Sequence, residues 1–305
     1  VPIYTVLALV TMEQALYNRS VKYCKVAIKG IGANNRRSRG IHPYNTLVNN
    51  YARLGEYGKS AHWCEQARIS SVLHNSRNNF YLSQLNRADM EMARGRLRQA
   101  ESLLLPLIET GNGPTDSVLR GLVSQNLGEI SALRGEIEVA DRYLSEADIH
   151  YKQAQADSYR LRVRVLRLIA HLPKSIAHGI EEWKDCLRRL CEARLYFHVS
   201  RLLCYTVLYF DGQEMEAVRR TVKPARKVLS GSAAPVMKAA SVLLNSLDTD
   251  PNELGVSDRC LKQVYAILDK ASQFDLTGRI CELLAARYRN AGNYPLSRKF
   301  FRQAL

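Results

Sequence analysis

The chain has 305 residues, 46% hydrophobic and 24% charged, which suits one extended array or two ordinary domains. Its formal net charge of +15 is compatible with a nucleic acid or an acidic ligand as a partner. No run of 18 apolar residues and no signal peptide occurs, so we expect no membrane partner and a cytoplasmic location. The seven cysteines are odd in number, scattered and without a CxxC pair, which favours reduced, buried thiols.

A forty-residue period runs through the first half of the chain. In residues 124–147, two amphipathic runs meet at Gly135, and the same pattern surrounds Gly95 and Gly55. A glycine is favoured there because a left-handed residue at the end of a helix costs glycine least. Small residues mark the points where the two helices of each pair should cross: Ala8, Ala88 and Gly128 in the first helices, and Ser20, Ser60, Ala100 and Ala140 in the second.

The register loosens after residue 147 and returns near the end of the chain. We expect 151–172 to be one helix and 181–193 a second, with 232–247 and 257–271 as an irregular pair. Loops rich in glycine and asparagine, at 30–40 and 110–114, account for the period of forty. The repeats are therefore predicted to start near residues 1, 41, 81, 121, 157, 198, 233 and 278.

The order of large, small and aromatic residues in these copies resembles the tetratricopeptide repeat. The resemblance implies an all-α fold, a right-handed superhelical solenoid of about eight antiparallel helix pairs in a single array over residues 1–305. It also implies that the first helix of each pair lines a concave wall where ligands bind.

Tandem forty-residue repeats further resemble the sensor arrays of MalT-type members of the LuxR family of bacterial transcriptional activators. In that family, a nucleotide-binding module precedes the array, a helix-turn-helix follows it, and the array receives an inducer or an inhibitory protein. This sequence has no GxxxxGK[ST] motif and no evident DNA-reading helix-turn-helix. It begins at Val1 and ends without a polar capping helix, so we expect it to be a piece of a longer protein.

Polar residues occupy several positions predicted to line the concave groove. These candidate binding residues are Asn45, Asn49, Arg53, Asp89, Gln125 and Glu129. Amides, carboxylates and a guanidinium in one groove can hydrogen-bond a small-molecule inducer or a peptide of a protein partner. The alternative is that they are solvated groove residues. A clamp for a C-terminal carboxylate is rejected, because Leu85 and Asp89 stand where cations are needed.

A second candidate surface is basic. Arg160, Arg164 and Arg167 share one helix face, whereas Arg162 lies off that face. Together with Arg188 and Arg189 on the following helix, they form a candidate wall for a phosphate-rich partner, and the loop residues 36–39 are basic too. The alternative is an ordinary charged face that neighbouring glutamates neutralise.

Catalysis finds little support in the sequence. The seven histidines form no metal-spaced set, and the carboxylates form no convergent pair, so we expect no enzyme, no metal and no cofactor. Three hypotheses remain. The chain is a ligand- or partner-sensing module of a bacterial transcriptional regulator, a free-standing adaptor that docks a peptide or helix of a protein partner, or a basic helical-repeat binder of nucleic acid.

Overall fold

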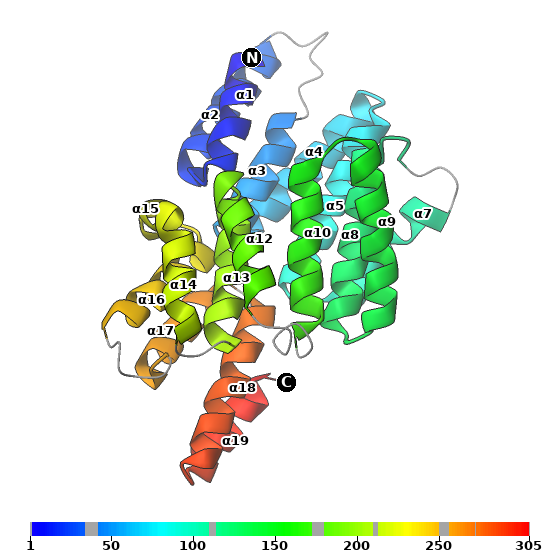
Figure 1. Ribbon diagram of the computed structural model, residues 1–305. Coiled ribbons are helices and arrows are strands. Elements are labelled where there is room, and N and C mark those ends of the chain that lie inside the picture. Colours follow the sequence, from blue (N-terminus) through cyan, green and yellow to red (C-terminus); the bar gives the residue numbers. More distant parts are fainter. Residues whose placement is uncertain are drawn as a thin grey trace. The chain divides into compact units, whose positions relative to one another are not determined.

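A computed structural model shows a chain built from helices, drawn in Figure 1. The structure describes residues 2–33, 42–109, 114–172, 180–209, 213–249, 256–271 and 273–304, and no strand occurs among them. The predicted all-α class is therefore confirmed. The chain divides into two compact units: unit 1 comprises Val1–Leu172 and Ala193–Leu195, and unit 2 comprises Pro173–Glu192 and Tyr196–Leu305.

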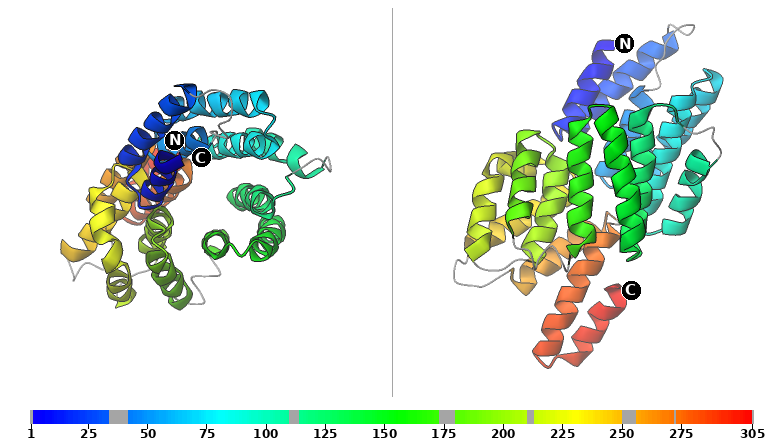
Figure 2. Two further views of the ribbon diagram at one scale, coloured as in Figure 1. Left: turned by 90° about the horizontal axis from the view of Figure 1, so that it is seen from above. Right: turned by 45° about the vertical axis from the view of Figure 1, so that its right-hand side comes forward.

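Unit 1 is a series of antiparallel helix pairs. Its helices are α1 (Pro2–Glu13), α2 (Tyr17–Ala33), α3 (His42–Arg53), α4 (Tyr57–Leu73), α5 (Arg77–Ala93), α6 (Leu97–Leu104), α7 (Pro106–Glu109), α8 (Ser117–Leu133), α9 (Ile137–Gln153) and α10 (Asp157–Ala170). Each first helix contacts the next first helix, from α1 through α3, α5 and α8 to α10. We call these five helices the inner layer, because the pairs of unit 1 follow a curve in Figure 2 with α2, α4 and α9 on its outer side.

The turn inside each pair has a left-handed residue. Gly55, Gly95 and Gly135 have φ values of 76°, 75° and 78°, and Ala15 takes the same conformation at 60°. A Cβ is disfavoured in this region of the φ/ψ map, which explains why glycine stands at three of these four turns. The period of forty thus marks a repeated backbone geometry.

Small residues at the crossing points bring the paired helices close together, as the sequence predicts. The serines among them also form a hydrogen bond that recurs in the register. Ser20 Oγ donates to the carbonyl of Ala8 at 2.6 Å, and Ser60 Oγ donates to that of Val48 at 2.8 Å. Each serine hydroxyl therefore has a hydrogen-bond acceptor at a buried crossing where a larger side chain would not fit.

Unit 2 consists of further paired helices. They are α12 (Glu181–Glu192), α13 (Tyr196–Tyr209), α14 (Gln213–Val222), the 3-10 turn η1 (Lys223–Ala225), α15 (Arg226–Gly231), α16 (Pro235–Thr249), α17 (Asp258–Asp269), α18 (Phe274–Asn290) and α19 (Tyr294–Ala304). Arg201 on α13 pairs with Asp275 on α18 at 3.2 Å. Ser297 Oγ on α19 donates to the carbonyl of Ala285 at 2.8 Å, which repeats the serine contact of unit 1.

The helix boundaries differ from the prediction at two places. α2 continues to Ala33, so the first four residues of the loop predicted at 30–40 belong to a helix. Residues 151–172 do not form one helix, because α9 ends at Gln153 and α10 begins at Asp157. Gln155 lies between them with a φ of 55°, so a left-handed residue ends the helix without a glycine to reveal it. Residues 34–41 and 110–113, which include the basic loop residues 36–39, lie outside the described residues.

Candidate functional site

The six candidate groove residues all lie on the inner layer of unit 1, in two environments. Asn45 and Gln125 are buried between neighbouring helices. Asn86 Nδ2 donates to Asn45 Oδ1 at 3.0 Å, and the Tyr151 hydroxyl donates to Gln125 Oε1 at 3.1 Å. Both amides therefore join adjacent helices through buried hydrogen bonds. Asn49, Arg53, Asp89 and Glu129 are half-buried or exposed.

Five charged side chains of the inner layer act on one another, and we call them the charged cluster. Its members are Glu13 at the end of α1, Arg53 on α3, Asp89 on α5, Glu129 on α8 and Arg162 on α10. Each comes from a different helix. The repeat register explains part of this arrangement, because Arg53 follows Glu13 by forty residues and Glu129 follows Asp89 by the same step. Equivalent positions of successive repeats thus supply four of the five charges.

Asp89 has an unusual electrostatic environment. Solvent reaches its side chain, yet the group is closely surrounded by protein, and this burial raises the pKa of Asp89 to about 6. Glu129 raises the pKa further by repulsion, whereas Arg53 and a 2.5 Å hydrogen bond from Asn126 Nδ2 lower it. Water at the exposed part of the side chain screens some of this charge.

Arg53 is also enclosed. Burial lowers the pKa of its guanidinium, and so does the nearby Arg162, whereas Tyr17, Asp89 and Glu13 raise it. Burial likewise raises the pKa of Tyr17 to about 12. An enclosed guanidinium between two carboxylates and a second guanidinium is held by its neighbours rather than by water.

Arg162 connects the far end of the inner layer with its beginning. Its guanidinium lies 3.9 Å from the Glu13 carboxylate and 4.4 Å from the centre of the Tyr159 ring, on which it makes a cation–π contact. Its Nε is buried without a hydrogen-bond partner among the described residues. The sequence shows only that Arg162 lies off the face of the other arginines on α10, and that offset is the signal of its separate role.

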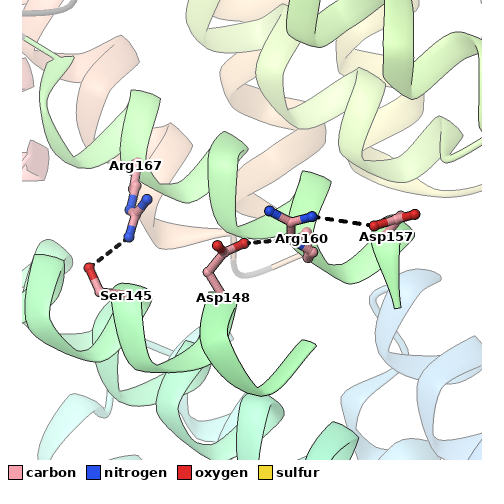
Figure 3. A network of polar contacts seen from close by, with 5 residues as sticks. All are labelled: Ser145, Asp148, Asp157, Arg160 and Arg167. Carbon is pink, nitrogen blue, oxygen red and sulfur yellow. Dashed lines mark hydrogen bonds and ion pairs between the residues drawn. The ribbon is translucent and has the colours of Figure 1, made fainter. Parts of the chain in front are cut away.

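The predicted basic surface is divided between the two units, and ion pairs neutralise most of it. In unit 1, Arg160 pairs with Asp148 at 3.0 Å and with Asp157 at 3.5 Å, as Figure 3 shows. Arg167 donates to Ser145 Oγ at 2.8 Å in the same network, and Arg164 is half-buried on the same helix. Arg160 and Arg167 thus contact residues of α9, so they help to hold α9 and α10 together.

The arginines of unit 2 are paired along α12. Arg188 lies 2.6 Å from Asp185 and 2.7 Å from Glu192, and Arg189 lies 3.1 Å from Asp185. These pairs join residues one helical turn apart on an exposed face. Such pairs are typical of an ordinary charged surface, which is the second interpretation that the sequence leaves open.

The part of the chain that the structure describes contains no group of three or more His, Cys, Asp or Glu side chains that is arranged to hold a metal ion. None of its helices combines the length and the apolar character needed to cross a bilayer. No protein-family model matches the chain, and no curated protein resembles it significantly.

Proposed function

We propose that the chain is a non-catalytic binding module whose inner layer in unit 1 receives a ligand or partner at the charged cluster. The resemblance to MalT-type sensor arrays favours a sensing module of a bacterial transcriptional regulator. A free-standing adaptor that docks a peptide or helix would use the same residues. The ion pairs of Arg160 and Arg188 leave the nucleic-acid hypothesis with less support than these two.

One observation carries the proposal: five charged groups from five successive first helices meet where protein partly encloses them. Enclosing charges costs stability, because they lose hydration that their mutual attraction only partly replaces. Apolar or neutral residues at these positions would hold the helices together equally well. Charges retained at such a cost are a feature of binding and catalytic sites.

The composition of the cluster suits a polar ligand. Two guanidinium groups can bind a carboxylate or phosphate, and three carboxylates can bind an ammonium group or hydroxyls. Arg53 and Arg162 are close enough to affect each other, and so are Asp89 and Glu129. A ligand that lies between these like-charged neighbours would relieve repulsion in both pairs.

Native mass spectrometry of the chain, purified gently from its own host, tests the proposal. We expect a stoichiometric small molecule or polypeptide to remain bound. Asp89→Asn and Glu129→Gln should lose it while keeping or raising the thermal midpoint, and Arg53→Gln should lose it as well. Arg134→Gln is the matched control, because Arg134 pairs with Glu101 at 2.8 Å in the same unit but outside the cluster.

Two results would contradict the proposal. One is a bound species that persists equally in the three cluster variants. The other is a bare chain that acquires no partner when it is returned to a lysate of its host. The sequence of the full open reading frame separates the two forms of the proposal, because only the sensing module should lie between a P-loop module and a helix-turn-helix.

A further inference from the structure

The like charges of the charged cluster are grouped in neighbouring pairs. Arg53 and Arg162 act on each other, and so do Asp89 and Glu129. Arg53 also acts on Asp89, so the two pairs lie side by side on the inner layer of unit 1. The cluster therefore has a cationic part and an acidic part, and each part is repelled internally.

In the cationic part, the protein supplies few hydrogen bonds to Arg162. The guanidinium lies 3.9 Å from the Glu13 carboxylate, which is too long for a hydrogen bond. It also lies over the Tyr159 ring, whose face attracts a cation without neutralising it. Within the described residues, its Nε has no hydrogen-bond partner. A carboxylate placed between Arg162 and Arg53 would add charge-assisted hydrogen bonds that the protein does not provide.

The acidic part needs a positive charge. Asp89 accepts a hydrogen bond of 2.5 Å from Asn126 Nδ2, but this donor is neutral and leaves the repulsion by Glu129 in place. Solvent reaches the Asp89 side chain, so a small molecule can reach it too. An ammonium group between the two carboxylates would replace one repulsion by two attractions.

The mixture of signs selects among ligand classes. The cluster holds two guanidinium groups and three carboxylates, so a ligand with anionic groups alone is repelled by the acidic part. A ligand with cationic groups alone is repelled by the arginines. A neutral, hydroxyl-rich ligand would leave both internal repulsions in place. Only a ligand that carries one group of each sign relieves both.

We infer that the charged cluster binds a small zwitterion, with its carboxylate between Arg53 and Arg162 and its ammonium group between Asp89 and Glu129. The inference rests on the proposed function and names the class of ligand. α3 contacts α5, and α5 contacts α8. Because packed helices lie about 8–10 Å apart, a chain of a few methylene groups is long enough to join the two charged ends. The ligand is therefore of the size of an amino acid.

Ligand-observed NMR titrations of the chain with three probes test the inference. The probes share a chain of three methylene groups: γ-aminobutyrate is the zwitterion, glutarate the dianion and trimethylenediamine the dication. At neutral pH and low salt, we expect γ-aminobutyrate to bind with a Kd of about 1 mM or lower. It should bind about tenfold more tightly than either other probe, because each of those exchanges an attraction for a repulsion.

Variants of the cluster should reverse this order. The double variant Asp89→Asn with Glu129→Gln keeps the arginines and should bind glutarate most tightly. Arg53→Gln leaves mainly carboxylates and should bind trimethylenediamine most tightly. A purely structural role of these residues would not reverse a preference. Arg134→Gln, whose partner Glu101 lies outside the cluster, is the matched control and should keep the order of the wild type.

Three results would each overturn the inference. The first is wild-type binding of glutarate or trimethylenediamine as tight as that of γ-aminobutyrate, and the second is no saturation by γ-aminobutyrate up to about 10 mM. The third is a double variant that keeps the order of the wild type, which decides the matter even if Arg53→Gln does not fold. The proposed function would survive these results if the species retained in native mass spectrometry were still lost from the cluster variants. A bare chain that acquires no partner would end both.

Discussion

Asp89 is the residue at which the stability of the fold and the chemistry of the candidate site conflict most directly. Its carboxylate is partly enclosed, repelled by Glu129, and held by the neutral side chain of Asn126. The raised pKa means that the folded state binds a proton more tightly than the unfolded state does. The fold therefore gains stability from this group as the pH falls from above 6 toward 4, and loses it as the pH rises again.

Asp89→Asn should remove this pH dependence. Asparagine keeps an oxygen that accepts the hydrogen bond from Asn126 and carries no charge at any pH. Between about pH 8 and about pH 5, the wild type should gain roughly 1 kcal/mol in free energy of unfolding relative to the variant, a value discounted for solvent screening. Urea unfolding of both proteins at the two pH values measures the difference. Parallel pH profiles for the two proteins would show that Asp89 has an ordinary pKa.

The crossing of α8 and α9 shows how a glycine, which has no side chain, allows two paired helices to approach closely. A Cβ added at Gly128 would lie 2.8 Å from Cγ of Leu144 and 3.3 Å from the carbonyl oxygen of Ala140. Leu144 is buried, so it has little room to move. The small residue predicted at this position is thus required by close approach of the helices.

Gly128→Ala and Gly58→Ala should change stability in opposite directions. At Gly128 the added methyl group overpacks the crossing, which typically costs about 1–3 kcal/mol, and Gly128→Leu should cost more. At Gly58, within α4, an added Cβ meets nothing within 4 Å, so alanine should stabilise the helix by about 0.5–1 kcal/mol. Thermal unfolding of both variants measures the two shifts. A Gly128→Ala midpoint at or above that of the wild type would show that the predicted crossing is wrong.

Many of the helices and turns could be predicted from the sequence, because the glycines and small residues repeat with the backbone geometry. The first helices begin at residues 2, 42, 77, 117, 157, 196, 235 and 274, close to the predicted repeat starts. The turn at Gln155 was missed because any residue can adopt a left-handed φ at some cost. Whether the two units form one continuous right-handed superhelix stays a prediction.

The candidate site could be predicted only in part. Register alone places Arg53, Asp89 and Glu129 on the inner layer. It does not show that Asn45 and Gln125 turn into the packing between helices, because that depends on the sizes of Asn86 and Tyr151 opposite them. It also misses Glu13 and Arg162, because their contact joins α1 to α10 and depends on the curvature of all the pairs between them.

At the scale of the whole molecule, the excess of positive charge is unevenly distributed. Many arginines are paired with a carboxylate one turn away on their own helix, as on α12. α2 differs, because it carries four exposed cations and no Asp or Glu: Arg19, Lys22, Lys25 and Lys29. Within the described residues, no ion pair involves these four side chains. Nonspecific attraction of polyanions is therefore expected at α2 rather than at the arginines of α10 and α12.

A triple variant, with Lys22, Lys25 and Lys29 changed to Gln, should weaken binding of a random single-stranded oligonucleotide at low salt. Each lost phosphate contact reduces the slope of log K against log salt by about 0.7, so three contacts reduce it by about 2. Replacing Arg160 and Arg167 by Gln should leave the slope unchanged, because these side chains already bond within the protein. Fluorescence anisotropy over a salt series measures both slopes. A larger effect of the two arginines would restore support for the nucleic-acid hypothesis.

The cysteines give the molecule an internal set of chemical reporters. All seven are buried, with Cys24 and Cys64 in unit 1 and the other five in unit 2. Burial raises the pKa of Cys24 to about 12 and that of Cys64 to about 11, so their thiolates are scarce while the helices stay closed. A thiol reagent will therefore modify each cysteine at a rate set by the opening of the helices around it. Mapping the modified peptides over time would follow the breathing of each unit separately in the unaltered protein.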